Sequence, residues 1–244
     1  MLSRIAFALV SGFIVTAAAS TAQAQVTSYS DASGDIDPNI ATAGGTLDLL
    51  GMEISNTASD IVFRLTVNGD IASTDWGKFM VGIAKVGGSG TTSGNGWNRP
   101  INMNAAGGMT NWLGGWVNGG GGGESYVFQS AAWSRVGATW QGNFPGSYSI
   151  AAGATSTVTW TVSLTSMGLS LGDTFLFDAY SSGGSDPDSA VDALANPNIS
   201  VTGWNGPYTS GGSNPIYSYT VVPAPGAVAL LGLAGLIAGR RRRA

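Results

Sequence analysis

Three carboxylates lie within seven residues near the start of the chain, in the segment Asp31-Ala-Ser-Gly-Asp35-Ile-Asp37. Hard cations such as Ca²⁺ take several oxygen ligands from a tight loop, and the glycine between the aspartates allows such a bend. The segment is not an EF-hand loop, because no glutamate stands at its twelfth position. We expect Asp31, Asp35 and Asp37 to be calcium ligands.

A second acidic group, Asp186, Asp188 and Asp192, follows a predicted strand further along the chain. The two acidic groups could converge in space. The alternative for all of these residues is that aspartate simply favours turns, where neighbouring backbone N–H groups donate to its side chain.

Four tryptophans stand in segments rich in glycine, asparagine or proline: Trp97, Trp112, Trp116 and Trp204. A tryptophan on an exposed loop can stack on the apolar face of a sugar ring, and Arg99 is a candidate donor to the sugar hydroxyls. We expect these five residues to bind a ligand. The alternative is that the tryptophans cap the core, which is where Trp133, Trp140 and Trp160 are expected.

The residue types most often used in catalysis are missing. The chain has no cysteine and no histidine, which excludes thiolate nucleophiles, zinc–thiolate sites and the commonest general base. A glycoside hydrolase could still use two carboxylates ~5 to ~9 Å apart, for instance among Asp178, Asp186 and Asp188. No catalytic motif accompanies them, so we do not expect an enzyme.

The net charge limits the partners. When Arg4 and the C-terminal cluster Arg240–Arg243 are set aside, five basic residues remain against 14 acidic residues, which is a net charge of −9. Phosphate backbones repel such a body, so nucleic-acid binding is not expected.

The elements that must position these side chains are predicted to be strands. Residues 61–68 alternate apolar and polar side chains, which is typical of a half-buried strand, and residues 46–55 precede them as the other half of a hairpin. Further strands are predicted at 79–86, 126–129, 134–140, 155–164 and 173–180, with one helical turn at 165–169. Many short strands between turns predict an all-β fold, a single antiparallel β-sandwich of jelly-roll type over residues 25–221. Long loops are expected at 87–123 and 196–215.

The N-terminus carries the features of a signal peptide. Arg4 precedes an apolar run over residues 5–15, and Ala22-Gln23-Ala24 is the small-x-small pattern that signal peptidase requires. We expect residues 1–24 to be removed on export.

The C-terminus combines a rigid start, an apolar run and a charged end. Val222-Pro223-Ala224-Pro225 leads into the uncharged residues 226–239, which are followed by Arg240, Arg241, Arg242 and Arg243. About 14 helical residues at ~1.5 Å each span roughly 21 Å, short of a ~30 Å hydrocarbon core. The arginines would stay on the cytoplasmic side, so the run is expected to be a short, transient membrane helix.

Within the tail, residues 222–244, this three-part order over residues 222–243 resembles the PEP-CTERM sorting signal of exopolysaccharide-producing Gram-negative bacteria. The usual tetrad of that family is Val-Pro-Glu-Pro, and this chain has Ala224 in place of the glutamate. The resemblance implies that a membrane-embedded exosortase cuts near the motif and passes the protein to the cell surface or outside.

The body is similar in its order of motifs to DOMON-like domains. An aspartate-rich opening is followed by DLLGMEIS, DIVFRLTV and SSGGSDPDSAVDAL. Such domains include the sandwich at the C-terminus of some glucodextranases and the family 9 carbohydrate-binding modules, and the resemblance implies sugar or haem binding. The haem-binding members use histidine and methionine ligands, so a chain without histidine leaves the sugar-binding expectation.

We therefore expect an exported protein of the cell envelope or extracellular matrix that binds polysaccharide without catalysis. Its expected partners are signal peptidase, an exosortase-like enzyme, the membrane during sorting, and polysaccharide. One alternative is a structural or adhesive matrix protein without a defined sugar site, and the lesser alternative is the carboxylate-pair glycoside hydrolase.

Overall fold

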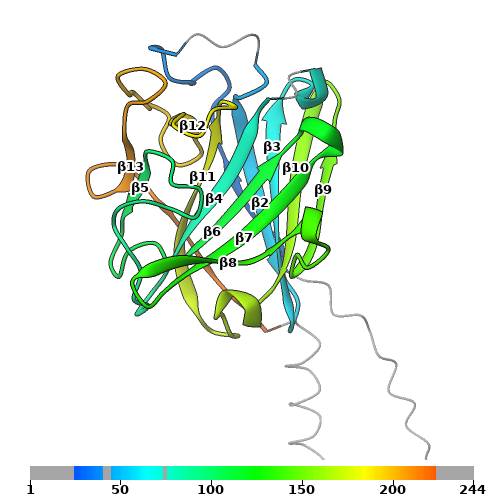
Figure 1. The fold of residues 1–244 in the computed structure, drawn as a ribbon, viewed down its shortest axis with the longest axis vertical. Helices are drawn as coiled ribbons and strands as arrows, with labels where there is room; N and C mark the ends of the chain where they lie inside the picture. The colour runs from blue at the N-terminus through cyan, green and yellow to red at the C-terminus, as the bar shows by residue number, and fades with distance from the viewer. Residues whose placement is uncertain (1–24, 41–44, 74–75, 224–244) are drawn as a thin grey trace, which may run out of the picture.

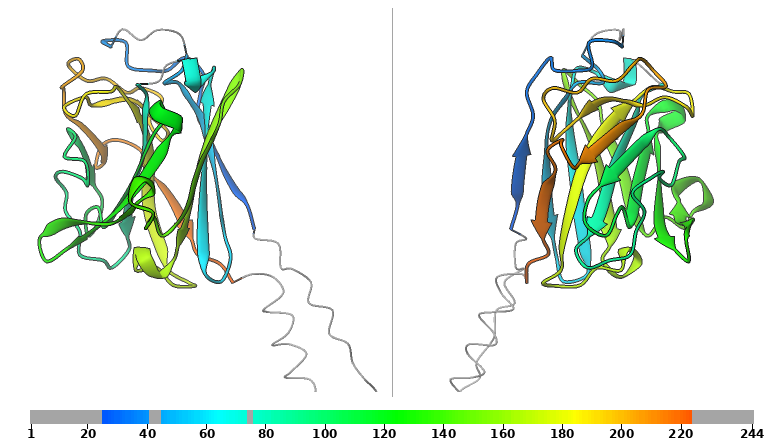
Figure 2. Two further views of the ribbon diagram at one scale, coloured as in Figure 1. Left: turned by 45° about the vertical axis from the view of Figure 1, so that its right-hand side comes forward. Right: turned by 90° about the vertical axis from the view of Figure 1, so that its left-hand side faces the viewer.

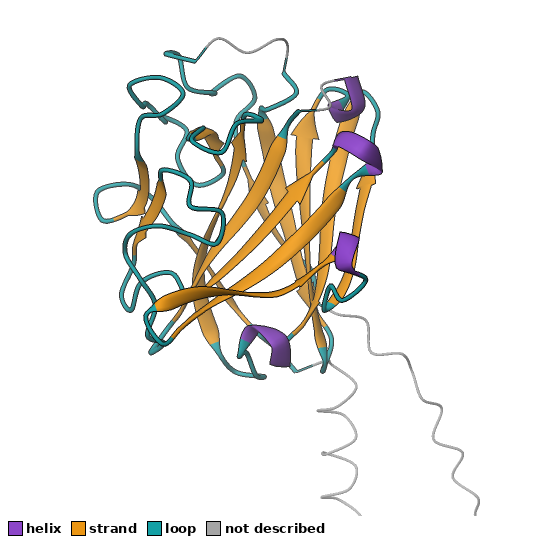
Figure 3. Cartoon of the chain, in the orientation of Figure 1, coloured by secondary structure: helices purple, strands orange, loops and turns teal. Residues whose placement is uncertain are grey.

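The computed structural model describes residues 25–40, 45–73 and 76–223. Antiparallel sheets pack face to face in this part of the chain, which confirms the predicted all-β sandwich (Figures 1 and 2). The only helices among the described residues are single 3-10 turns (Figure 3). No helix in the described ranges is long and apolar enough to cross a bilayer. The expected signal peptide and the tail from Ala224 onward lie outside them.

The first sheet contains the strands whose alternation is clearest in the sequence. In spatial order these are β1 (Thr27–Ser30), β2 (Leu49–Asn56), β3 (Asp60–Asn68), β10 (Thr155–Ser163) and β9 (Gly146–Ala151). The predicted hairpin of β2 and β3 is confirmed, and Phe63 of β3 lies opposite Trp160 of β10. Both side chains are fully buried, as are the other alternate residues of β3, so this face forms one half of the core.

The second sheet carries the candidate site. In spatial order it contains β12 (Ala190–Ala193), β11 (Thr174–Ser182), β4 (Lys78–Lys85), β6 (Asn111–Trp116), β7 (Gly122–Gln129) and β8 (Ala132–Ala138), with β14 (Tyr217–Thr220) paired to the start of β11. A separate parallel pair is formed by β5 (Ile101–Asn104) and β13 (Tyr208–Gly211). The 3-10 turns are η1 (Ile71–Ser73), η2 (Asn118–Gly120), η3 (Thr139–Gln141) and η4 (Thr165–Met167).

The segment 87–123, expected to be a loop, instead contains β5, β6 and the first residues of β7. Strand β6 was missed because glycine is depleted in strands, and β6 has two in its centre. A β-carbon at Gly114 would overlap the ring of Trp97, whereas one at Gly115 would lie 2.7 Å from Tyr148 and 2.9 Å from Trp160. Gly115 therefore faces the core between the sheets, and Gly114 faces outward. Segment 196–215 likewise contains β13.

Asp178 of β11 is 0% exposed, and its carboxyl oxygens accept hydrogen bonds from the backbone of Ala179 and Ala195 and, at 2.5 Å, from the Ser210 hydroxyl. It therefore cannot reach a substrate, which removes it from the proposed hydrolase pair. Burial raises its pKa to about 7.

This buried carboxyl should make stability depend on pH. Between pH ~4 and ~7 the folded state keeps the Asp178 proton that the unfolded state has lost, so stability falls as pH rises, by about 1.4 kcal/mol per pH unit. Asp178→Asn retains an acceptor for the backbone donors and cannot ionise, so its urea-unfolding free energy should fall less steeply over this range. Equal slopes for the two proteins would contradict this account.

Candidate functional site

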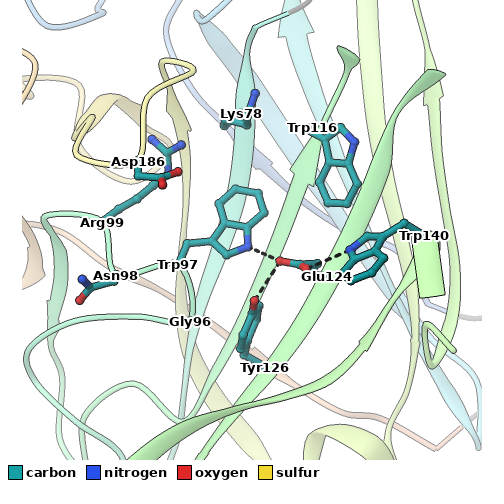
Figure 4. A pocket seen from close by; sticks show the side chains of 10 residues that line it. All are labelled: Lys78, Gly96, Trp97, Asn98, Arg99, Trp116, Glu124, Tyr126, Trp140 and Asp186. Carbon is teal, nitrogen blue, oxygen red and sulfur yellow. Dashed lines mark hydrogen bonds between the residues drawn. The ribbon is translucent and has the colours of Figure 1, made fainter. Parts of the chain in front are cut away.

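An open hollow of about 490 Å³ lies on the outer face of the second sheet, over β4, β6 and β7 (Figure 4). Its wall is completed by a segment before β5, a segment after β11, and the 3-10 turn that contains Trp140. The side chains and backbone that line it are those of Lys78, Gly96, Trp97, Asn98, Arg99, Trp116, Glu124, Tyr126, Trp140 and Asp186.

Glu124 of β7 is the centre of this hollow. One carboxylate oxygen accepts hydrogen bonds from Trp97 Nε1 at 2.6 Å and from the Tyr126 hydroxyl at 2.9 Å. The other accepts from Arg135 at 3.0 Å and from Trp140 Nε1 at 3.2 Å. Charge-assisted bonds of this kind are the strong ones, so a single carboxylate, itself 8% exposed, fixes the orientation of three aromatic rings.

The local electrostatics keep these donors protonated. Burial and the neighbouring Glu124 raise the pKa of Tyr126 to about 12, so its hydroxyl donates throughout the physiological range. The Arg135 guanidinium lies 5.0 Å from the centroid of the Trp140 ring, which holds that exposed ring by a cation–π contact. The protein's own contacts thus fix the orientations of these side chains.

The loop that carries Trp97 is held by a buried asparagine. The Asn95 side-chain oxygen accepts from the backbone N–H groups of Trp97 and Arg99, and its amide nitrogen donates to the carbonyls of Arg99 and Ile101. The indole of Trp97 then lies against Gly114, where any side chain would displace it. Trp116 lies in the same way over Gly122, one of the glycines expected to form a loop.

Arg99 lines the hollow, but its guanidinium forms hydrogen bonds to other residues of the protein. It is 4% exposed, and one guanidinium nitrogen donates to the Ser182 hydroxyl at 2.7 Å and to the Asp188 carbonyl at 3.0 Å. Burial lowers its pKa. Its observed contacts tie the loop before β5 to the loop after β11.

The expectation for Trp112 is wrong. Its side chain is 0% exposed and stacks on Tyr180, with the ring centroids 6.0 Å apart, and Tyr180 in turn packs against Tyr208 of β13. Trp112 is therefore a core residue and cannot stack on a ligand. Trp204 lies in a different hollow, beside Trp76.

The hollow also contains residues that were not predicted. Trp140 was expected in the core and is 62% exposed, while Glu124 and Tyr126 were not singled out. A sequence signal for the last two exists: they alternate on one face of a strand, and glutamate occurs only twice in the chain. No comparable signal in the sequence predicts the turn between β7 and β8, after which Arg135 and Trp140 lie beside Glu124.

The acidic residues near the start of the chain are only partly brought together. Asp31 and Asp35 meet Asp192 of β12, with one carboxylate oxygen of each within 4.8 Å of the others. Asp37 lies outside this cluster, because its oxygens accept from the backbone N–H groups of Asn39 and Val201. The two acidic groups thus do converge, but only through Asp192, which takes the place expected for Asp37.

The cluster places carboxylate oxygens together without enough donors. One oxygen of Asp31 and both oxygens of Asp35 are buried and have no hydrogen-bond partner among the described residues. Burial, Asp192 and Asp35 raise the pKa of Asp31, and burial is also the main cause that raises the pKa of Asp192 to about 7. A bound cation would stabilise this cluster, which has three unpartnered carboxylate oxygens and no positive charge within it.

The chain matches no protein-family model, no curated protein and no solved structure in the comparisons with known proteins. What the hollow and the cluster bind is therefore inferred from their own residues.

The carboxylates left for a hydrolase are poorly placed for proton transfer. Asp186 is exposed at the rim, whereas one Asp188 oxygen accepts from the Ser185 backbone. Glu124 lies at the base of the hollow, but four donors already occupy its oxygens. A general acid or base must exchange a proton with its substrate, and both oxygens of Glu124 are already engaged by side chains of the protein.

Proposed function

We propose that this protein binds polysaccharide non-catalytically, on the outer face of its second sheet. The observation that carries the proposal is the arrangement of Trp97, Trp116 and Trp140 with Tyr126 around one open hollow. Flat aromatic rings held in fixed orientations offer apolar stacking surfaces at little cost in conformational entropy. Asn98 and Asp186 at the rim, both exposed, supply polar groups for sugar hydroxyls.

Glu124 supports a binding function in preference to catalysis. Its four hydrogen bonds orient the rings that would contact the sugar. It is a positioning residue in this proposal, and the glycoside hydrolase remains the less favoured alternative.

We also propose that the protein is exported and sorted through its C-terminal tail to the cell surface or extracellular matrix, by an exosortase-like enzyme. The geometry of the body is compatible with this. Asn56 holds Val222 through hydrogen bonds to both its N–H and its carbonyl, so the chain leaves the body at a fixed point. That point adjoins the start of β11, and the hollow adjoins its end. The strand has nine residues, and the steps between them at ~3.4 Å each separate its two ends by about 27 Å.

A second proposal is that Asp31, Asp35 and Asp192 bind Ca²⁺. It rests on the buried, unpartnered oxygens of Asp31 and Asp35. A hard cation with flexible coordination suits a set of carboxylates drawn from a loop and a strand. The ion would fasten the segment after β1 to β12 and so contribute to stability.

Removal of the Trp97 or the Trp116 indole, two of the three that line the hollow, should strongly weaken polysaccharide binding. The full chain would be run by native affinity electrophoresis through gels that contain β-1,3-glucan, β-1,4-glucan, xylan, alginate or hyaluronan. Trp97→Ala and Trp116→Ala should each weaken retention about tenfold or more, which corresponds to at least ~1.4 kcal/mol.

Trp133→Ala is the matched control for these variants. Trp133 packs against Phe128 with ring centroids 5.4 Å apart and does not line the hollow, so retention should be unchanged. Equal retention of the wild type and the Trp97 and Trp116 variants would place the sugar site elsewhere. A wild type that no polymer retards would favour the structural or adhesive alternative.

A further inference from the structure

A second aromatic hollow, of about 420 Å³, lies just beyond the end of β11 and the start of β4. Trp76 and Trp204 meet there edge to face, with ring centroids 6.4 Å apart. The hollow is completed by the loop residues Gly183, Gly184, Ser185 and Asp188. Both indoles are partly exposed, so each keeps surface that a ligand could cover.

Hydrogen bonds and a close contact with a glycine hold the residues of the second hollow in place, as they do in the first. The Trp204 carbonyl accepts from the Ser189 N–H at 2.6 Å, and a β-carbon at Gly183 would lie 2.6 Å from the Trp204 ring. Asp188 accepts from the Ser185 N–H at 2.9 Å. A glycine thus makes room for an indole here, as Gly114 does in the first hollow.

The two hollows share their walls. Lys78 lines the first and Trp76 lines the second, and the Lys78 ammonium donates to the Trp76 carbonyl at 2.8 Å. On the other side, Asp186 lines the first hollow and its neighbour Ser185 lines the second. The guanidinium of Arg99, which lines the first, is bonded to the carbonyl of Asp188, which lines the second.

The strand register gives the direction and scale of the combined surface. Lys78 of β4 pairs with Trp116 on one side and with Ser182 of β11 on the other, so these three residues lie at one level of the sheet. Two strand spacings of ~4.8 Å put Trp116 and Ser182 about 10 Å apart, and the Trp204 indole lies one residue beyond Ser182, against Gly183. One pyranose ring is too short to reach both indoles.

We propose that the two hollows are subsites of one groove that binds a run of consecutive sugar units within a linear polysaccharide chain. One part of the polysaccharide stacks in the hollow of Trp97 and Trp116, and a later part of the same polysaccharide stacks on Trp204 and Trp76. This inference rests on the proposed polysaccharide function, and it specifies the substrate class as a polymer of several units. Linked subsites raise affinity because binding at the second becomes intramolecular.

The test uses fragments of whichever named polysaccharide retards the wild type most, separated by size from two to eight sugar units. Isothermal titration of the full chain should show affinity that rises at least about tenfold between short and long fragments. Trp204→Ala should remove that rise. The affinity for the shortest fragments that the wild type binds should stay the same in this variant. Trp116→Ala should weaken fragments of every length, and Trp133→Ala should match the wild type.

The outcomes separate the two levels of the proposal. Affinity that does not increase with length, or a Trp204→Ala protein that equals the wild type for long fragments, would overturn the shared groove and leave the first hollow as a sugar site. If no polysaccharide retards the wild type, the proposed function fails and the groove fails with it. Circular dichroism of Trp204→Ala would establish that a loss of long-fragment affinity does not come from unfolding.

Discussion

Millimolar Ca²⁺ is expected to raise the melting temperature of the full chain, and a chelator to reverse the shift. A ligand that binds only the folded state stabilises it by about 2.7 kcal/mol at a concentration 100-fold above its dissociation constant. For a domain of this size, each kcal/mol moves the melting temperature by ~2 to ~4 °C, so a shift of roughly 5–10 °C is expected. Differential scanning fluorimetry would measure it.

The shift should depend on the acidic cluster of the structure. Asp35→Asn is the sharpest variant, because neither Asp35 oxygen has a hydrogen bond among the described residues that the change could break. It should remove the response to Ca²⁺, and without Ca²⁺ it should be no less stable than the wild type at pH 8, because one buried negative charge is gone. The response of the wild type should be smaller at pH 5, where protons compete with the cation for carboxylates of raised pKa.

Asp37→Asn is the control, since Asp37 lies outside the cluster and holds backbone N–H groups. It should lower the melting temperature and keep the Ca²⁺ shift. If Asp37→Asn abolishes the shift, Asp37 is a ligand as the sequence predicts. If Asp35→Asn keeps the shift, the cluster around Asp192 is not the site. No shift in the wild type at millimolar Ca²⁺ would remove both.

Gly114→Ala is expected to weaken polysaccharide binding strongly although it adds only one methyl group. The new β-carbon would overlap the Trp97 ring, and strand β6 cannot move away because it is paired on both sides. Trp97 would have to leave, and its 2.6 Å hydrogen bond to Glu124 would be lost. Retention in affinity electrophoresis should fall about as far as in Trp97→Ala, by roughly tenfold or more.

Two other glycines serve as controls. Gly115→Ala adds the same methyl on the opposite face, 2.7 Å from Tyr148 and 2.9 Å from Trp160, so it should cost stability by about 1–3 kcal/mol through overpacking of the core. Gly153→Ala meets only a backbone oxygen at 3.5 Å and should change neither property. If Gly114→Ala binds polysaccharide like Gly153→Ala, Trp97 is not part of the binding surface.

The strands were predictable where residues alternate. In β3 apolar and polar side chains alternate from Phe63 onward, and in β10 they alternate from Thr157 onward. These strands lie together in the sheet with Phe63 opposite Trp160. Strand β6 was not predictable, because its glycines are selected by rings that come from other parts of the chain. Nothing near Gly114 in the sequence indicates that the indole of Trp97 will cover it.

The candidate site was predictable only in part, for a related reason. Trp97, Arg99 and Trp116 do line the first hollow, and Trp204 lines the second, but Trp112 is a core residue although its local sequence resembles theirs. A glycine-rich context does not distinguish a tryptophan that faces water from one that another segment covers.

By itself, the sequence determined the all-β class, through the period of its strands, and it excluded chemistry that needs cysteine or histidine. Both follow from residue identity or from spacing along one strand, which are local properties. Only the tertiary structure decided which side chains meet. Glu124 gathers rings from three separate segments, and Asp31 and Asp35 find Asp192 more than 150 residues away. Such meetings depend on strand pairing and on the space that glycines leave, which no local spacing records.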